Sequence, residues 1–562
     1  MISNTDIRYF FDTYYDNFMH SLAWEDHLLE PASREEWLAT LRACADDQQQ
    51  RCADNQILLE QYLYPLSSNP ALLSDEGYDL LLSFCRDFYY SNYTEPALLI
   101  RIIDILLPHY EDRSDTESLL FLYICAGFSY MELSRTGEPT SRDKTIYFYT
   151  KVLSYRDQIE FFESAASRDY IFIAYYNLIR VAPGLGILDI ETAYRLWEEL
   201  CQIRTMPKFC QYDTTNPRIP QLCDCAINDF RAYGAVLNVE RVIAPSAILS
   251  SLENMTQIYY SEILHEHGSI YECPVFTVFN YHYVQARNGT ITWEAAWQIL
   301  DDYYVHKMQT IGQVSSPDLL AFYTNLPLNL IDVLGHTHFK EEFKQATYRR
   351  YRNLITSYLM NQPASLNSYT LNNGVQLVAF HPLILGTFQN RMEKMNFIVD
   401  LVVTRHLTTF THSVMVSYLA EAIGKHILAA RPELLRIPSS YLEGNVYASP
   451  AEVLDYIVPA ALFHDIGKNG MIPIINTQHR KLNDYEFNII QTHPQKGSDY
   501  LSSGPDFLIY QPVALGHHRS YDGTRGYPLS FDNTASPYRD AIDLIHICDC
   551  LDAACLLYTS DA

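Results

Sequence analysis

Histidine and aspartate residues recur in the C-terminal part of the chain in a pattern that suits metal binding. His464 and Asp465 are adjacent and follow an apolar run, where two ionisable side chains are costly to bury unless something satisfies them. Metal coordination is the usual solution for such a pair. The other candidate ligands are spread along the chain: His412, His493, His517, His518 and Asp549.

These donor types indicate the chemistry of the site. Imidazole nitrogens and carboxylates together suit borderline divalent cations such as Fe, Mn, Co, Ni or Zn. With two cations, Asp465 would be a bridging carboxylate. A water held between the ions loses a proton near neutral pH and becomes a nucleophile, while the ions hold phosphoryl oxygens. Any one of these histidines alone would be better explained as an ordinary core or surface residue, but the joint spacing favours a metal centre.

The helix that leads into His464 has a well-defined start. Ser449 is a good N-cap, Pro450 suits the first helical position, and Glu452 completes a capping box. Apolar residues then recur at three- and four-residue intervals, which predicts a buried helix with a kink at Pro459.

Gly467 allows that helix to stop, so that Lys468 can project into the same pocket. A second helix is predicted to open at Asn483, to be capped by Glu486, and to run to His493, before the next proline. The two helix-terminal histidines are 29 residues apart, which fits a helical hairpin that returns the second towards the first.

Two further helices are expected to complete the site. One begins near Thr411, with His412 in line with apolar residues on one face. The other begins after Pro537 and carries Asp549 and Asp552, which are three residues apart and therefore on one side of the helix.

Several short stretches of this region occur in a specific order and spacing. They are His464-Asp-Ile-Gly-Lys468, His493-Pro-Gln-Lys-Gly497, His517-His518, Asp522-Gly523, Gly526-Tyr527-Pro528 and Asp549-Cys-Leu-Asp552-Ala553. Together they resemble the HD-GYP family of HD-superfamily metal-dependent phosphodiesterases, which hydrolyse cyclic di-GMP in bacteria. The resemblance covers roughly residues 400–554, about a quarter of the chain.

The resemblance implies an all-α fold and a di-metal centre. By position, the ligands would be His412, His464, Asp465, His493, His517, His518 and Asp549. It also implies that Lys468 contacts a phosphate, that Tyr527 lies in the substrate-lip motif, and that Asp552 acts near the bridging water or leaving group. The residues expected to contact the substrate are Lys468, Arg519, Asp522, Arg525, Gly526, Tyr527 and Pro528.

One stretch departs from the family's His-His-Glu-x-x-Asp-Gly-x-Gly-Tyr-Pro pattern. Arg519 stands in the place of the glutamate, and one extra residue precedes Gly-Tyr-Pro, so the loop is expected to sit differently. Arg519 and Arg525 add positive charge beside the pocket, which favours an anionic ligand. Two solvated loop arginines are an equally good interpretation.

Two other departures concern the cations and the end of the chain. Some family members carry a glutamate one helical turn before the first histidine and hold a third metal; Thr408 is at that position here, so two divalent ions, Fe, Mn or similar, are expected. We interpret residues 555–562 as a non-native tail, the read-through of a sequencing-library adapter. The domain would then be truncated at its C-terminal end, without the family's later phosphate-binding basic residues, and would hold metal yet bind substrate poorly.

The remaining chain is also expected to be helical. Residues 1–240 contain apolar residues at helical intervals, joined by short polar links, which is typical of an array of helical hairpins, loosely tetratricopeptide-like. Residues 241–396 are interpreted as a second helical region of unknown role. The predicted fold is therefore all-α, with the hairpin array followed by an HD-superfamily helical bundle over residues 397–554.

Composition excludes some classes of protein. The 562-residue chain has a formal net charge of −27, which disfavours binding to DNA or RNA polymers but allows a small anionic ligand. No apolar stretch approaches about 18 residues, and no signal peptide is visible, so a cytoplasmic protein without a membrane segment is expected. The 12 cysteines are scattered, as in proteins that keep reduced thiols.

We therefore expect a bacterial signalling phosphodiesterase that acts on a cyclic dinucleotide, with cyclic di-GMP as the first choice. The N-terminal helical region would be its regulatory part and would bind a protein partner. Two alternatives stay open. One is an HD-superfamily phosphohydrolase acting on another nucleotide, favoured by Arg519 and the inserted residue. The other is a non-catalytic interaction module, against which the intact set of ligands argues.

Overall fold

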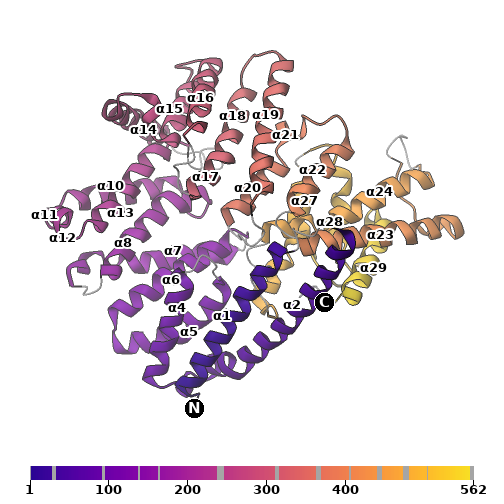
Figure 1. Ribbon diagram of the computed structural model, residues 1–562, viewed down its shortest axis with the longest axis horizontal. Helices are drawn as coiled ribbons and strands as arrows, with labels where there is room; N and C mark the ends of the chain where they lie inside the picture. The colour runs from indigo at the N-terminus through magenta and orange to yellow at the C-terminus, as the bar shows by residue number, and fades with distance from the viewer. Residues whose placement is uncertain are drawn as a thin grey trace. The chain divides into compact units, whose positions relative to one another are not determined.

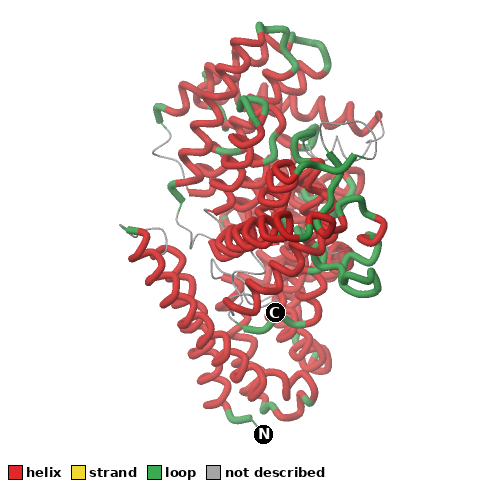
Figure 2. Tube along the Cα trace, turned by 90° about the vertical axis from the view of Figure 1, so that its right-hand side faces the viewer, coloured by secondary structure: helices red, strands yellow, loops and turns green. Residues whose placement is uncertain are grey.

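The protein is built from helices. The computed structural model describes residues 2–27, 33–90, 95–136, 139–161, 165–236, 246–310, 316–362, 369–403, 407–439, 446–471, 480–502 and 504–556. Within these ranges no strand forms, and the β pairing consists of two isolated bridges, between Pro438 and Tyr447 and between Arg519 and Gly526. Figure 2 shows the helices and the loops that join them. The prediction of an all-α fold is confirmed.

Helices form where apolar side chains recur at helical intervals. In α4 (Asp75–Tyr90) the buried residues are Gly77, Tyr78, Leu81, Leu82, Phe84, Cys85 and Phe88, which lie on one face. The next helix, α5 (Pro96–Arg113), begins with proline at its first position and ends at Ser114, whose φ of 53° is left-handed. Such starts and stops let one helix follow another after only a few residues, as a helical hairpin requires.

One compact unit consists of Met1–Arg8, Leu63–Leu319 and Leu328–Lys344. Along it, successive helices pack against one another, as expected for a hairpin array. Its principal helices after α5 are α6 (Thr116–Ser134), α7 (Pro139–Leu153), α8 (Ala165–Tyr176), α10 (Ile190–Thr205), α13 (Arg218–Tyr233), α14 (Ser246–His267), α15 (Val275–Arg287) and α16 (Trp293–Met308), which follow the colour ramp from purple to rose in Figure 1.

The first helices of neighbouring hairpins lie parallel in this unit. Near the start of α6, Glu117 accepts a hydrogen bond from the Ser167 hydroxyl of α8 at 3.2 Å. Further along both helices, the rings of Phe121 and Tyr170 have their centroids 5.9 Å apart. The second contact lies further towards the C-terminal end of both α6 and α8 than the first, so the two helices run parallel. Helix α7 lies between them in sequence. This order is the arrangement of stacked helical hairpins.

The second compact unit consists of Tyr9–Tyr62, Leu320–Pro327 and Gln345–Ala562. Besides the long helices α1 (Asn4–His27, from Tyr9 onwards) and α2 (Arg34–Leu58), it contains α19 (Glu341–Met360, from Gln345 onwards), α20 (Tyr369–Ala379), α22 (Arg391–Val403), α23 (Leu407–Ala430), α24 (Pro450–Phe463), the 3-10 turn η8 (Ile466–Met471), α26 (Asp484–Ile490), α27 (His493–Leu501), α28 (Gln511–Gly516) and α29 (Arg539–Leu556). The expected boundary near residue 240 falls outside the described residues. Residue 396 lies inside α22, so the division into three regions stays a prediction.

Both predicted capping boxes are present. The Ser449 hydroxyl accepts a hydrogen bond from the Glu452 amide at 3.4 Å, and the Glu452 carboxylate accepts one from the Ser449 amide at 2.7 Å. Asn483 and Glu486 repeat this arrangement at the start of α26. That helix ends at Ile490, however, and does not run to His493 as predicted. His493 begins α27 instead, because the proline that follows it fits the first turn of a helix.

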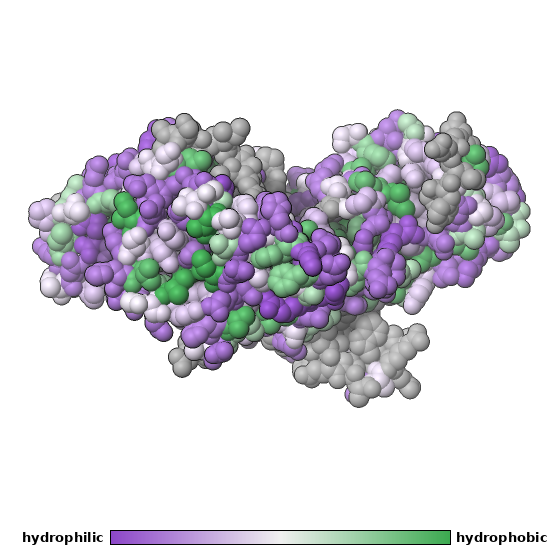
Figure 3. All heavy atoms as spheres, turned by 90° about the horizontal axis from the view of Figure 1, so that it is seen from above, coloured by the Kyte–Doolittle hydropathy of each residue, from purple (hydrophilic) through white to green (hydrophobic). Residues whose placement is uncertain are grey.

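The described helices carry polar residues on much of their surface. In the face shown in Figure 3, hydrophilic residues predominate and hydrophobic ones are scattered among them. Of the helices within the described ranges, none combines the length and the apolar character that spanning a membrane requires. The cysteines whose side chains are described are all free thiols.

Candidate metal centre

Helix ends bring the candidate ligands together in the second unit. His464 is the C-cap of α24, and Asp465 follows it directly. His493 is the first residue of α27, and His517 is the C-cap of α28. Both imidazoles lie beside the Asp465 carboxylate. The interiors of α23 and α29 supply the remaining two, His412 and Asp549. Helix α23 begins at Leu407, one turn earlier than predicted.

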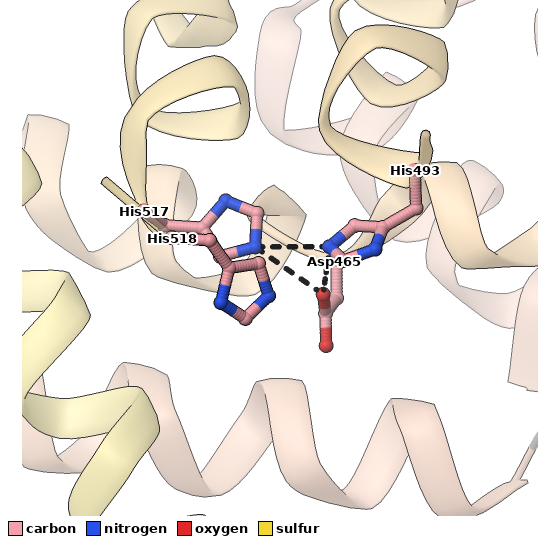
Figure 4. A group of neighbouring side chains, drawn as sticks. All are labelled: Asp465, His493, His517 and His518. Atoms are coloured by element: carbon pink, nitrogen blue, oxygen red, sulfur yellow. Dashed lines mark hydrogen bonds and ion pairs between the residues drawn. The ribbon is translucent and has the colours of Figure 1, made fainter. Parts of the chain in front are cut away.

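A first group of donor atoms consists of Asp465, His493, His517 and His518, with ligand atoms all within 4.8 Å of one another. The Oδ1 atom of Asp465 is 3.1 Å from Nε2 of His493 and 3.5 Å from Nε2 of His517. These two Nε2 atoms are 3.1 Å apart. Figure 4 shows the imidazoles of His493 and His517 directed at the carboxylate, with His518 beside them. Three of the four side chains are buried, and His518 is partly exposed.

A second group consists of His412, His464 and Asp549, again with ligand atoms within 4.8 Å. Oδ1 of Asp549 is 2.9 Å from Nε2 of His412 and 3.7 Å from Nε2 of His464. The second oxygen of Asp465, Oδ2, is 3.5 Å from Nε2 of His412 and 3.4 Å from Nε2 of His464. Asp465 therefore faces the first group with one oxygen and the second group with the other.

Backbone carbonyls fix the tautomers of three of these imidazoles. Nδ1 of His464 is 2.6 Å from the Ala461 carbonyl oxygen, and Nδ1 of His493 is 2.8 Å from that of Ile490. Nδ1 of His517 is likewise 2.9 Å from a carbonyl oxygen three residues earlier. Because a carbonyl only accepts, each Nδ1 carries the proton in the neutral ring, and each Nε2 presents a lone pair to the centre.

This arrangement fits bound cations. Unprotonated Nε2 atoms of His493 and His517 face one another and a carboxylate oxygen, three lone pairs that repel unless a positive charge lies between them. Among the described residues, Nε2 of His464 is buried without a hydrogen-bond partner, a state that costs free energy unless something else satisfies it. Nitrogen and carboxylate donors of this kind suit Fe, Mn or Zn.

The protonation states of the buried groups follow from their surroundings. Burial lowers the pKa of His517 to about 4 and that of His518 well below its ordinary value, so both are neutral at pH 7, as ligands must be. Burial opposes the charged form of His412 too, but hydrogen bonds to Asp549 and Asp552 outweigh it and raise its pKa to about 9. Burial raises the pKa of Asp465, but Lys468 and the histidines outweigh it, so the carboxylate stays ionised.

Lys468 reaches the centre as the sequence predicts. It lies on η8, is 6% exposed, and places Nζ 3.0 Å from Oδ2 of Asp465. Asp552 is buried as well, and its Oδ2 is 2.6 Å from Nδ1 of His412. The structure thus places the Asp552 carboxylate against a candidate ligand; the catalytic role that the resemblance implies for it stays a prediction.

The loop at 519–528 uses Arg519 differently from either interpretation of the sequence. Arg519 is 4% exposed, and its guanidinium donates hydrogen bonds to the carbonyl oxygens of Gly523 and Gly526, the latter at 3.1 Å. Both glycines have positive φ, 71° and 83°, which other residues rarely adopt. The arginine is therefore not solvated: its two terminal nitrogens hold the loop, and its Nε is buried without a hydrogen-bond partner. Its expected substrate contact stays a prediction that this geometry does not favour.

Of the other loop residues, some make contacts within the loop and others lie beside the candidate metal centre. The Asp522 carboxylate accepts hydrogen bonds from the Ser520 hydroxyl and from the Thr524 amide and hydroxyl, so it is used within the loop. Arg525 is exposed. The Tyr527 ring is 4.6 Å from that of His518, which places it beside the centre. Gly526 precedes Tyr527, and a cis peptide bond joins Tyr527 to Pro528.

Two contributions to the site were missed from the sequence. Gly467, interpreted as a helix stop, is also a point of close approach: a Cβ there would collide with the His493 carbonyl oxygen and the Gly497 amide. His546 was not singled out, yet its Nδ1 is 2.5 Å from the His517 carbonyl oxygen. Its position three residues before Asp549, one turn back on α29, was the pattern that could have suggested it. The side chain of Thr408 and residues 557–562 lie outside the described residues.

Known protein families and curated proteins match the part of the chain that contains the candidate metal centre. Residues 409–555 match the model of the HD domain. A cyclic di-GMP phosphodiesterase of Vibrio cholerae is 26% identical over 242 residues, which cover 38% of this chain and 48% of the relative. The cyclic di-GMP phosphodiesterase response regulator RpfG of Xanthomonas campestris is 33% identical over 104 residues, which cover 18% of this chain and 27% of the relative.

A third relative matches over a shorter stretch. A cyclic di-GMP phosphodiesterase of Pseudomonas aeruginosa is 39% identical over 71 residues, 12% of this chain and 17% of the relative. The chain thus spans less than half the length of each of these curated relatives. No solved structure matches the chain.

Residues 409–555 are accordingly an HD domain, the fold of metal-dependent phosphohydrolases. Within that superfamily, the segment belongs to the HD-GYP family, as its motifs and these relatives agree. The assignment concerns this segment and not the residues before it.

Proposed function

We propose that the protein is a metal-dependent phosphodiesterase that hydrolyses a cyclic dinucleotide, cyclic di-GMP in the first place, in bacterial cytoplasmic signalling. The observation that carries this proposal is the position of Asp465, with one carboxylate oxygen facing each of two buried donor groups. Two cations sharing one carboxylate are a common arrangement for displacement at phosphorus. The names of the relatives support the choice of substrate.

Each cation would have its own protein ligands. One would be held by His412, His464 and Asp549, the other by His493, His517 and His518, with Asp465 shared. When bound, the cations would lower the pKa of a coordinated water and polarise the phosphoryl oxygens. The protein would contribute the fixed directions of the imidazoles and a buried setting in which charges act strongly.

Residues beside the centre would hold the substrate. Nζ of Lys468 lies within the same buried space and would stabilise negative charge that develops on the phosphoryl group. Tyr527 beside His518 would contact the substrate from the loop, and the exposed guanidinium of Arg525 would meet a phosphate at the entrance. The N-terminal hairpin array would bind a protein partner that carries the input to this domain.

The test is turnover by the full chain loaded with Mn or Fe. We expect cyclic di-GMP to be converted to the linear dinucleotide or to GMP, and Asp465→Ala to abolish this reaction. Asp455→Ala, which removes an exposed carboxylate from α24, is the matched control and should leave turnover unchanged.

A nucleotide panel separates the alternatives. Turnover of another nucleotide with none of cyclic di-GMP would favour the second phosphohydrolase activity, for which the inserted residue in the 519–528 loop is the specific observation. No turnover of any nucleotide, together with no bound metal, would contradict the proposal and favour an interaction module.

A further inference from the structure

The imidazoles at the centre are not all held in the same way. His464, His493 and His517 each direct Nδ1 at a backbone carbonyl oxygen within their own helical turn, at 2.6, 2.8 and 2.9 Å. His412 differs from these three: its Nδ1 is 2.6 Å from Oδ2 of Asp552, a carboxylate on another helix.

Helix α29 contacts both nitrogens of this ring. Oδ1 of Asp549 is 2.9 Å from Nε2 of His412, and Oδ2 of Asp552 is 2.6 Å from Nδ1. The two aspartates are three residues apart, so one face of α29 supplies both a candidate ligand and the group behind the neighbouring ligand. The direction of Nε2 of His412 therefore depends on the position of α29.

The position of the Asp552 carboxylate does not suit direct contact with a substrate. The residue is 3% exposed, and the described contact of its carboxylate is with the far side of the His412 ring, away from the nitrogen that faces the centre. A carboxylate behind a metal-bound imidazole fixes the ring and makes it a stronger donor, and losing such a partner typically weakens metal binding by about 10–100-fold.

We propose that Asp552 is a positioning residue that acts through His412, and that cation retention at the His412–His464–Asp549 group depends on Asp552, while the His493–His517–His518 group retains its cation without Asp552. The two halves of the centre are unequal in this sense: a side chain of a distant helix orients His412 in one half, whereas local backbone carbonyls orient His493 and His517 in the other. This inference rests on the proposed metal-dependent function.

Metal retention by the full chain tests it. The wild-type protein, loaded with Mn²⁺ and passed through a desalting column, should keep two equivalents, and Asp552→Asn should keep one, with the affinity of the lost ion lowered about 10–100-fold. Asp552→Glu, which retains a carboxylate, should recover part of that affinity and covers the case in which the asparagine variant folds poorly. Electron paramagnetic resonance should change from a coupled Mn²⁺ pair to a single isolated ion in Asp552→Asn.

Asp543→Asn is the matched control. Asp543 lies on the same helix and is paired with Arg539 at 3.6 Å, so this variant should keep both ions. Retention of both ions at wild-type affinity in Asp552→Asn, or equal loss of both, would overturn the inference. A wild-type protein that holds no metal at all would instead contradict the proposed function itself.

Discussion

At the scale of single residues, Asp465 and Lys468 are the groups on which the chemistry depends most. Asp465 links the two donor groups, and Lys468 adds the one buried ammonium described beside it, at 3.0 Å. We expect Lys468→Met to lower kcat on a cyclic dinucleotide by about 100-fold or more, because it removes a charge that stabilises the transition state while keeping the apolar stem. Metal content should not change. Steady-state kinetics beside metal analysis would check this, and unchanged kcat would contradict it.

The protonation of His412 gives a second prediction at this scale. In the metal-free protein its pKa is raised to about 9, so at pH 7 a cation must displace a proton from it. The apparent affinity for the cation bound by His412 should therefore rise about tenfold per pH unit between pH 6.5 and 8.5. Mn²⁺ titrations at three pH values would measure it, and an affinity independent of pH would contradict it.

The same shift affects the stability of the metal-free protein, with a definite sign. The folded-state pKa of His412 lies above its ordinary value, so the ion pairs with Asp549 and Asp552 stabilise the fold fully below about pH 6.5. This contribution should be lost as the pH rises through 9.

At the scale of elements, η8 must approach α27 closely for Asp465 to meet His493. Gly467 permits this approach, since a Cβ would meet backbone atoms of α27. Gly467→Ala should lower the free energy of unfolding by about 1–3 kcal/mol and reduce metal content, because backbone must move. Gly504→Ala is the control: its Cβ would lie 3.7 Å from the nearest atom, a Phe507 ring carbon. Equal melting temperatures for Gly467→Ala and the wild type would contradict this account.

The 519–528 loop is the other element whose shape depends on one side chain. Because the buried Arg519 guanidinium holds two of its carbonyl groups, Arg519→Gln should free the loop and speed tryptic cleavage after the exposed Arg525. Mass spectrometry of a digestion time course would measure the rate. Arg431→Gln, at an exposed arginine, should leave it unchanged. Equal cleavage rates in wild type and Arg519→Gln would show that this side chain does not hold the loop.

At the scale of the whole molecule, the sequence was informative where spacing implies chemistry. The capping boxes at Ser449 and Asn483 could be predicted because a cap depends on residue types at short separations, and the ligand candidates, which lie far apart in the chain, were indicated by residue type and by the order of their motifs. The contact of Asp552 with His412 could not, because 140 residues separate them and only the packing of α29 on α23 joins them. The role of Arg519 was missed because charge alone does not reveal burial.

The HD segment has helical neighbours within its compact unit. Helix α20 packs against η8, and the Phe380 ring stacks on that of Tyr500 in α27, with centroids 5.2 Å apart. Phe380 lies directly after α20, and Phe380→Ala should destabilise the unit by about 3–5 kcal/mol, while Leu377→Ala, 48% exposed on α20, should cost less than about 0.5 kcal/mol. Thermal melts of the full chain would compare them, and equal effects would show that α20 does not support the site.

The proposed chemistry depends on two cations sharing Asp465, and anomalous diffraction from crystals of the full chain loaded with Mn²⁺ tests this most directly. We predict two peaks in contact with the Asp465 carboxylate, one beside His493 and His517, the other beside His412 and Asp549. An absence of peaks at these residues, in a protein whose histidines are intact, would contradict the account.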